Sequence, residues 1–255
     1  MADLVVRANG NLWPELRRCW RLLRVITHIF YGLLQTLRLI AWRRPYSAAV
    51  RAATQRWLQQ LLAILAVQVE VRGQPLAGPV FLVSNHVSWL DIPLIGVQRP
   101  LSFLSKEEVR DWPLIGLLAR AIGTLFIRRG SGESQRKAEE IAAHLAGGHA
   151  VVIFPEGTTT DGHSVRRFFP QLFAAPLLAS VPVQPMALRY LDEHGQPDQQ
   201  LAFVGDDEFH HHLWHLLLRD RIEVRLCWGE PLPASPDRDL LARRAHAAVT
   251  SLLNG

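Results

Sequence analysis

The sequence is poor in cysteine: Cys19 and Cys227 are the only two, far apart and without the spacing of a metal site. A disulfide framework is therefore excluded, and the pattern fits a reducing compartment. Cys227 lies in an apolar run and is most simply a core residue. Charged residues, at 20%, are too few for a disordered chain, whereas 49% of the 255 residues are hydrophobic and suffice for a sizeable core. We expect one large domain, or one domain with an appendage.

Acidic residues are scarce at the start of the chain. Residues 1–72 hold eleven arginines and three acidic residues, a net charge of +8, whereas residues 73–255 carry a net charge of −3. A basic head on a slightly acidic body indicates an anionic partner. Nucleic acid and lipid headgroups are the two obvious candidates.

The head also lacks a long uncharged run. Between residues 12 and 44, the longest stretch without a charged residue is Val25–Leu37. It is shorter than the roughly 20 apolar residues that span a bilayer, although snorkelling of Arg24 and Arg38 would lengthen it. Leucine and tryptophan suit lipid better than phosphate-only contacts, so we expect a membrane and no nucleic acid as partner. Three tryptophans have the pattern of interfacial anchors: Trp13, Trp20 and Trp42.

A second helix is predicted over residues 47–66, after a turn at Pro45. The two helices would form a hairpin that lies in, or dips into, one leaflet; the alternative is a pair of ordinary core helices. A secretory signal peptide is not indicated, because the polar start is long and no small-residue cleavage site ends the apolar run. We therefore expect residues 1–67 to be a membrane-anchoring motif and residues 68–255 to be the main domain.

From about residue 68, short β-branched runs alternate with helical patterns. This alternation predicts an α/β domain with a mostly parallel central sheet flanked by helices. No internal repeat or low-complexity segment interrupts it. The expected strands are 69–73, 80–85, 101–106, 124–128, 150–155, 181–190 and 222–229, and the expected helices are 108–121, 134–146, 167–179, 206–218 and 237–253.

His86 and Asp91 lie five positions apart where one of these strands ends. At that spacing they share neither a helical face nor one side of a strand, so only a turn lets the side chains meet. In such a turn the carboxylate would fix the imidazole tautomer and leave the other nitrogen free to accept a proton from a hydroxyl. The hydroxyl belongs either to the protein or to a substrate, and the lack of a G-x-S-x-G motif disfavours a serine nucleophile. The plainer alternative is a helix cap beside a loop histidine.

Other polar residues also follow strands, where the sites of parallel sheets form. Arg128 and Arg129 precede a glycine-rich turn and either recognise phosphate or form a solvated pair. Glu156 would pair with these arginines or bind polar groups of a substrate. For a group of four histidines we favour surface residues over a metal site, because acidic residues precede them at a helix start: His210, His211, His212 and His215.

Together these stretches resemble the glycerolipid acyltransferase family, whose members include 1-acyl-glycerol-3-phosphate acyltransferases. Lys106, followed by a Pro-x-x-Gly segment, resembles a further feature of the family, and the basic two-helix head is similar to its membrane-anchoring motif. Four blocks carry the resemblance, in order, across residues 80–190: His-x-x-x-x-Asp (His86–Asp91), a glycine-to-arginine block (Gly123–Arg129), Phe-Pro-Glu-Gly-Thr (Phe154–Thr158) and Val-Pro-Val-x-Pro (Val181–Pro185).

The resemblance implies that His86, held by Asp91, deprotonates the free hydroxyl of a lysophospholipid, which then attacks an acyl thioester directly. Acyl carrier protein or coenzyme A would carry the thioester as co-substrate, without another cofactor. With 1-acyl-glycerol-3-phosphate as acceptor, the product would be phosphatidic acid. The implied substrate-binding residues are Lys106, Arg128, Arg129, Glu156, Gly157, Thr158, Arg166, Arg167, Pro182 and Pro185.

One position departs from the family pattern. Thr159 stands where many members have an arginine that assists phosphate binding. Either Arg166 and Arg167 supply that charge, or the acceptor differs and a lyso-ornithine lipid replaces lysophosphatidate. A non-catalytic lipid-binding protein of the same fold is a further alternative. The expected location is the cytoplasmic face of the inner membrane.

Overall fold

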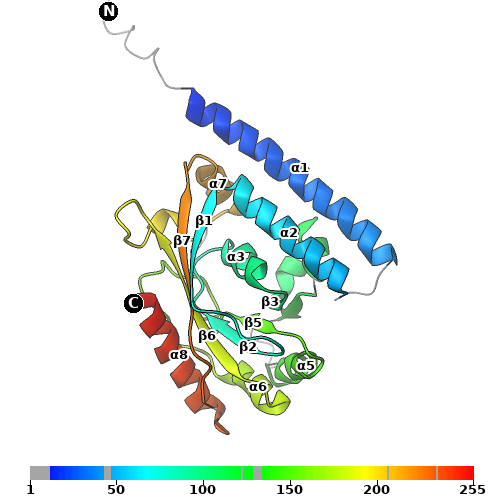
Figure 1. The fold of residues 1–255 in the computed structure, drawn as a ribbon, viewed down its shortest axis with the longest axis vertical. Coiled ribbons are helices and arrows are strands. Elements are labelled where there is room, and N and C mark those ends of the chain that lie inside the picture. Colours follow the sequence, from blue (N-terminus) through cyan, green and yellow to red (C-terminus); the bar gives the residue numbers. More distant parts are fainter. Residues whose placement is uncertain (1–11, 43–46, 122, 129–133, 206, 234) are drawn as a thin grey trace, which may run out of the picture.

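The computed structural model describes most of the chain (Figure 1). The described residues are 12–42, 47–121, 123–128, 134–205, 207–233 and 235–255, with only the backbone for 39–42. The helices are α1 (Trp13–Trp42), α2 (Ala48–Ile64), α3 (Asp91–Gln98), α4 (Ile115–Ala121), α5 (Ser134–Ala146), α6 (Ala174–Ala179), α7 (Phe209–Leu216) and α8 (Arg238–Asn254). The strands are β1 (Val67–Arg72), β2 (Phe81–Ser84), β3 (Ser102–Lys106), β4 (Leu125–Ile127), β5 (Val151–Ile153), β6 (Val183–Leu191) and β7 (Ile222–Trp228). Short 3-10 segments are η1 (Glu107–Asp111), η2 (Gln171–Phe173) and η3 (Gln199–Leu201).

The strands form one sheet in the order β1-β7-β6-β2-β5-β3-β4. Neighbouring strands are parallel except for β6 and β7, so β1 and β7 run opposite to the other five strands. Alternate side chains point to opposite faces: Leu82 and Val152 join one hydrophobic cluster, whereas Phe81 and Val151 join another. Helices α5, α6 and α8 cover one face, and α2 and α3 cover the other (Figure 1). The predicted mostly parallel α/β fold is thus confirmed.

Two predicted helices differ from the structure at prolines. The helix expected over 108–121 is divided into η1 and α4, because Trp112, which precedes Pro113, is extended at φ −66° and ψ 128°. The helix expected over 167–179 begins only after Pro170, as η2 and then α6. The ring of a proline disfavours helical geometry in the residue before it, so the first predicted helix is interrupted and the second begins later than predicted.

The two-helix head shares the core of the main domain. Val25 of α1 and Leu62 of α2 belong to the hydrophobic cluster on the α2–α3 side of the sheet, and α2 packs against α3 and β1. Within the described residues, no helix combines the length and the apolar character needed to cross a bilayer. The interpretation of the head as ordinary core helices therefore holds for α2, but not for the outer face of α1.

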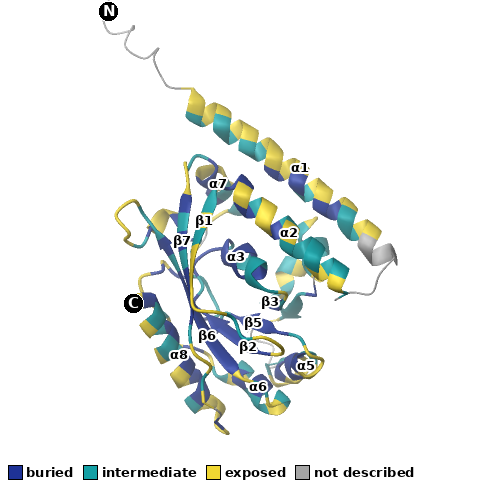
Figure 2. Cartoon of the chain, viewed as in Figure 1, coloured by how far each residue is buried: buried dark blue, intermediate teal, exposed yellow. Residues whose placement is uncertain are grey.

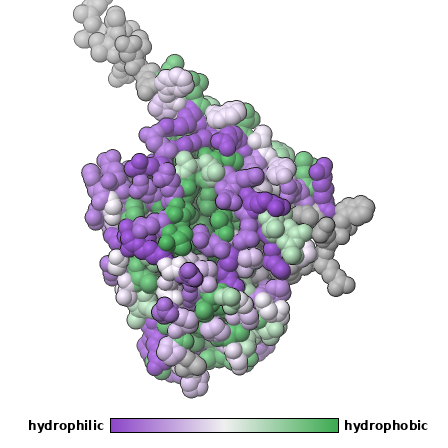
Figure 3. Space-filling view, viewed as in Figure 1, coloured by the Kyte–Doolittle hydropathy of each residue, from purple (hydrophilic) through white to green (hydrophobic). Residues whose placement is uncertain are grey.

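That outer face of α1 is apolar and exposed (Figure 2). By contrast, the view in Figure 3 is largely hydrophilic, with apolar side chains gathered in a hollow near its middle. The predicted anchor Trp42 lies where only the backbone is described. Tyr31 is exposed on α1, and the other large exposed apolar residues of this helix recur every three or four positions: Trp13, Leu16, Trp20, Leu23, Ile26, Phe30, Leu34 and Leu37.

Two arginines fix the start of α1 to the main domain. Arg17 donates to the carbonyl oxygen of Leu218 over 2.6 Å and pairs with Asp220. Arg21 donates to the carbonyl oxygens of Leu217 and Arg219. These carbonyls follow the end of α7, where backbone acceptors lack helical partners. Two arginines of the basic head thus bind the backbone of the main domain.

A reciprocal contact joins α1 to α2. Trp57 Nε1 donates to the carbonyl oxygen of His28 over 3.0 Å, and His28 Nε2 lies 2.9 Å from the carbonyl oxygen of Trp57. The two rings stack at 4.7 Å. Gly32, one turn beyond His28, permits this approach, because a Cβ there would lie 2.5 Å from Trp57 Nε1.

We predict that Gly32→Leu separates α1 from α2 and lowers the free energy of unfolding by about 1–3 kcal/mol, the usual cost of overpacking. Thermal and urea denaturation would measure the change. Ala63→Leu adds the same side chain at an exposed position of α2 and is expected to be neutral. Equal stability of the two variants would contradict the close packing at Gly32.

Candidate active site

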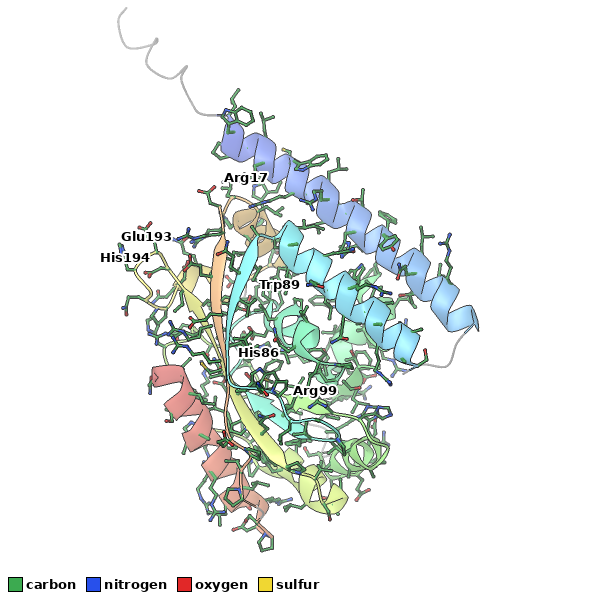
Figure 4. All side chains as sticks on the ribbon, viewed as in Figure 1. Arg17, His86, Trp89, Arg99, Glu193 and His194 are labelled. Atoms are coloured by element: carbon green, nitrogen blue, oxygen red, sulfur yellow. The ribbon has the colours of Figure 1, made fainter. Side chains whose placement is uncertain are left out.

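His86 and Asp91 meet at the carboxyl end of β2. The chain leaves this strand at Ser84, turns through residues 85–90 and enters α3 at Asp91. His86 Nδ1 lies 2.7 Å from Asp91 Oδ2. The turn required by their spacing is therefore present, and the pair forms as predicted. In Figure 4, His86 and Trp89 lie beneath α2, on its sheet side.

The Asp91 carboxylate is fully buried and accepts several hydrogen bonds. Besides the imidazole, Oδ2 accepts the backbone amides of Val87 (2.8 Å) and Ser88 (3.1 Å), while Oδ1 accepts the hydroxyl of Tyr190 (2.6 Å). Burial, followed by the neighbouring Asp91 charge, raises the pKa of Tyr190 well above its usual value, so the phenol remains a donor. Asp91 is thus an acceptor held in one orientation by four donors.

This arrangement gives His86 the geometry that a general base requires. Because a carboxylate can only accept, Nδ1 carries the proton and Nε2 is unprotonated in the neutral ring. The ring stacks on Phe154 at 4.0 Å and is one-fifth exposed, at 20% of its side-chain surface. Within the described part of the chain, no protein group hydrogen-bonds Nε2. The basic nitrogen is therefore available to a substrate hydroxyl.

Neither serine of the turn between β2 and α3 is placed as a nucleophile. Ser84 and Ser88 are fully buried, and neither hydroxyl contacts the imidazole. Ser84 Oγ approaches Asn85, whereas Ser88 Oγ has no partner within the described structure. This geometry favours a hydroxyl that arrives with a substrate, the alternative that the sequence had left open.

Glu156 connects two loops of the site. Its Oε1 accepts the amide of His86 over 2.8 Å, and its Oε2 accepts the amide of Arg166 over 2.7 Å. Burial raises the pKa of this carboxyl, while the two backbone hydrogen bonds oppose the change. The expected pairing with arginine side chains or substrate is therefore corrected: both oxygens hold backbone amides, and the residue is only 3% exposed.

The catalytic pair opens onto a cavity of about 910 Å³. Its lining is mostly apolar, which suits acyl chains. One part lies between α1, α2 and α4, with Ile29, Trp57 and Leu118 in its wall. Another part is polar and lies at the carboxyl ends of β3, β4 and β5. The residues of that end include Lys106, Arg128, Ser134, Thr158, Thr159 and Gln171.

The structure brings some of the predicted binding residues to this cavity. Lys106, Arg128, Gly157 and Thr158 line it. Arg129 lies outside the described residues. The exposed side chains Arg166 and Arg167 are not part of the lining.

The two prolines of the fourth block lie elsewhere. Pro182 is exposed just before β6, and Pro185 is buried within β6 opposite Val83. Neither proline is among the residues that line the cavity. The expectation that these prolines line the substrate pocket is therefore corrected.

The four histidines do not act together. His212 is buried and its Nδ1 accepts from Trp89 Nε1 over 3.0 Å. Burial lowers the pKa of His212, which favours the neutral ring needed for this contact. His210 and His211 are exposed and lie with Glu208 close enough to hold a metal ion. His215 is not part of that group.

Sequence reasoning missed the residues that support the pair from β6. Tyr190 is 99 positions from Asp91, and Asn85 exchanges hydrogen bonds with the backbone of Leu188 at 2.8 Å in both directions. A tyrosine in a largely buried strand was the available signal. The strand order, which places β6 beside β2, could not be read from it.

The chain is similar in sequence to known acyltransferases. The acyltransferase family profile matches residues 67–189. A lyso-ornithine lipid O-acyltransferase of Pseudomonas aeruginosa is 49% identical over 203 residues, covering 79% of this chain and 78% of that protein. A protein of the same name from Rhodobacter capsulatus is 36% identical, covering 82% and 77%. A 1-acyl-sn-glycerol-3-phosphate acyltransferase of Neisseria meningitidis is 33% identical, covering 65% and 66%.

A solved structure has the same fold. The 1-acyl-sn-glycerophosphate acyltransferase PlsC of Thermotoga maritima superposes with a TM-score of 0.68 at 21% identity, covering 95% of both chains. The family profile and the relatives named as acyltransferases place the chain among the acyltransferases. The chain belongs to the glycerolipid acyltransferase family, as the four sequence blocks predicted.

Proposed function

We propose that this acyltransferase esterifies the free hydroxyl of a lyso-ornithine lipid. The relatives that carry this name include the protein with 49% identity, and they match more of this chain than the Neisseria lysophosphatidate enzyme does. Our first sequence-based choice, 1-acyl-glycerol-3-phosphate, becomes the second candidate. The proposal rests on the 49% identity to a lyso-ornithine lipid O-acyltransferase, together with a threonine, Thr159, in the cavity wall where many family members have an arginine.

The polar end of the cavity is consistent with such an acceptor. An ornithine headgroup has a carboxylate and an ammonium group but no phosphate. Thr159 stands in the lining where many family members have a phosphate-binding arginine, and Arg166 and Arg167 do not replace it there. Arg128 and Lys106 remain as cationic groups for a single carboxylate.

The proposed reaction is a direct transfer. His86 Nε2 takes the proton of the lipid hydroxyl as its oxygen attacks the thioester carbonyl. The tetrahedral intermediate then expels the thiolate, which receives the proton from the imidazolium, so that an ester and a free thiol result. Asp91 stabilises the imidazolium without moving. Acyl carrier protein or coenzyme A supplies the thioester, and the proposed reaction uses no other cofactor.

The acceptor lies in a membrane, and we propose that residues 1–67 hold the enzyme there while residues 68–255 carry the chemistry. The exposed apolar face of α1 suits the interfacial region of a bilayer. Thioester donors are soluble in the cytoplasm, which favours the cytoplasmic face of the inner membrane.

The test is an acceptor and donor matrix with the full chain in mixed micelles. Lyso-ornithine lipid or lysophosphatidate is combined with acyl carrier protein or coenzyme A thioester, and His86→Gln serves as the blank. We expect kcat/KM to favour lyso-ornithine lipid by at least about tenfold, a difference of 1.4 kcal/mol. Thr159→Arg is expected to shift this ratio toward lysophosphatidate. A wild-type preference for lysophosphatidate would overturn the proposed acceptor.

A further inference from the structure

Three consecutive apolar residues form an exposed tip between η1 and α4. Trp112 and Leu114 are each 45% exposed, and Pro113 between them is also exposed. Trp112 and Leu114 belong to neither hydrophobic cluster of the described residues. Packing within the described part of the chain therefore gives no reason for a large apolar side chain at Leu114.

The backbone of the tip is unusual for a leucine. Leu114 has φ +65°, and the amide of Ile115 donates to the carbonyl oxygen of Pro113 over 2.7 Å. This three-residue turn with a positive φ is rare and strained, and glycine or asparagine fits the left-handed region better. A solvent-exposed loop under no other demand would not be expected to keep leucine there.

The tip is also held in place. The amide of Gly116 donates to the carbonyl oxygen of Trp112 over 2.9 Å. A Cβ at Gly116 would overlap the carbonyl oxygen of Arg110, so the glycine lets α4 pack directly on η1. The turn therefore presents Leu114 outward from a fixed base.

The position of the tip connects it to the route of a lipid. Trp112 and Ile115 line the catalytic cavity on either side of Leu114, which is not itself in the lining. Helix α4, which the tip precedes, contacts α1. The tip thus lies at the rim of the cavity, near the helix whose outer face is apolar.

We propose that the Trp112–Leu114 tip inserts into the lipid bilayer and forms, opposite α1, the entrance through which the acceptor reaches His86. This inference rests on the proposed lipid acceptor. The tip itself is uncharged, and the exposed charges beside it, Glu108, Arg110 and Asp111, sum to −1, so they offer no basic patch to an acidic protein. Tryptophan and leucine at one apex suit the membrane interface, and their contribution to binding is expected to be insensitive to salt.

The first test compares Leu114→Asn with Leu178→Asn. Asparagine tolerates the left-handed region, so the turn is preserved and the melting temperature is expected to be equal or higher. Leu178 is a matched control, an exposed leucine (58%) on α6. With lysolipid in phosphatidylcholine and phosphatidylglycerol vesicles, Leu114→Asn is expected to raise the apparent KM by about tenfold. With a short-chain monomeric lysolipid, its activity is expected to equal that of the wild type.

The second test locates the tip directly. In a Cys19→Ser background, Leu114→Cys or Leu178→Cys is labelled with an environment-sensitive fluorophore. The remaining cysteine, Cys227, is buried and is not expected to react with the label. On addition of the vesicles, the label at 114 is expected to shift to the blue and to be quenched by nitroxide lipids, whereas the label at 178 stays aqueous.

The outcomes separate this inference from the proposed function. Acyl transfer to lyso-ornithine lipid with an aqueous label at 114 would overturn the inference alone. Insertion of the label without such transfer would overturn the acceptor alone. If Leu114→Asn lost as much activity on monomeric lysolipid as on vesicles, the role of the tip would be structural. If the blue shift of the label required acyl carrier protein, the tip would be a protein-docking site. Either result would overturn membrane insertion.

Discussion

Replacing His86 by glutamine is expected to lower the rate of acyl transfer by about 10²- to 10⁴-fold, the usual contribution of a general base. Glutamine retains a polar side chain but cannot accept a proton at neutral pH. The free energy of unfolding should change little, because His86 is partly exposed and Asp91 keeps the amides of Val87 and Ser88 and the hydroxyl of Tyr190. Steady-state assays and urea denaturation would measure the two quantities separately.

The matched control is His194→Gln. His194 is exposed, at 76% of its side-chain surface, in the loop after β6, and Figure 4 shows it at the edge of the molecule, away from His86. Its replacement should leave both activity and stability unchanged. Turnover by His86→Gln within twofold of the wild type would remove His86 from the mechanism, and with it the direct attack by a lipid hydroxyl.

The catalytic pair could be predicted because it depends on local geometry. A histidine and an aspartate five positions apart at the end of a strand can meet only across a turn, and the same turn supplies two backbone amides to the carboxylate. The support from Tyr190 could not be predicted, because it requires β6 to pair with β2 across 99 positions of the chain. Glu156 was associated with the site, but its partners are backbone amides that no sequence pattern displays.

The structure of the two-helix head could likewise be predicted only in part. Its helical periodicity predicted an apolar face, and the exposed tryptophans of α1 agree with it. Periodicity could not separate the face that packs on the main domain from the face left open, since both are apolar. The reciprocal contact of His28 with Trp57 depends on the close approach allowed at Gly32, a tertiary effect. Arginine spacing likewise gave no indication that Arg17 and Arg21 would cap α7.

Replacing Asp91 by asparagine is expected to damage both catalysis and stability. Asparagine has an NH2 group, a donor, in place of one carboxylate oxygen. This group would face other donors: the imidazole and two backbone amides if it stood at Oδ2, or the Tyr190 hydroxyl if it stood at Oδ1. In the Ser-His-Asp catalytic triad, the same replacement of aspartate by asparagine leaves the wrong imidazole tautomer and lowers turnover by about 10⁴-fold. Each buried donor without an acceptor costs about 1–3 kcal/mol, so the free energy of unfolding should fall by at least that amount.

Tyr190→Phe separates the two effects. It removes one donor to Oδ1 and leaves the three bonds at Oδ2, including the imidazole contact, in place. We expect a loss of about 1–3 kcal/mol in stability but a rate within roughly tenfold of the wild type. The rate per folded molecule, measured below the melting temperature of each variant, distinguishes orientation from folding. If Asp91→Asn were as active as Tyr190→Phe, the carboxylate would serve only to hold the turn, and His86 would need another group to set its tautomer.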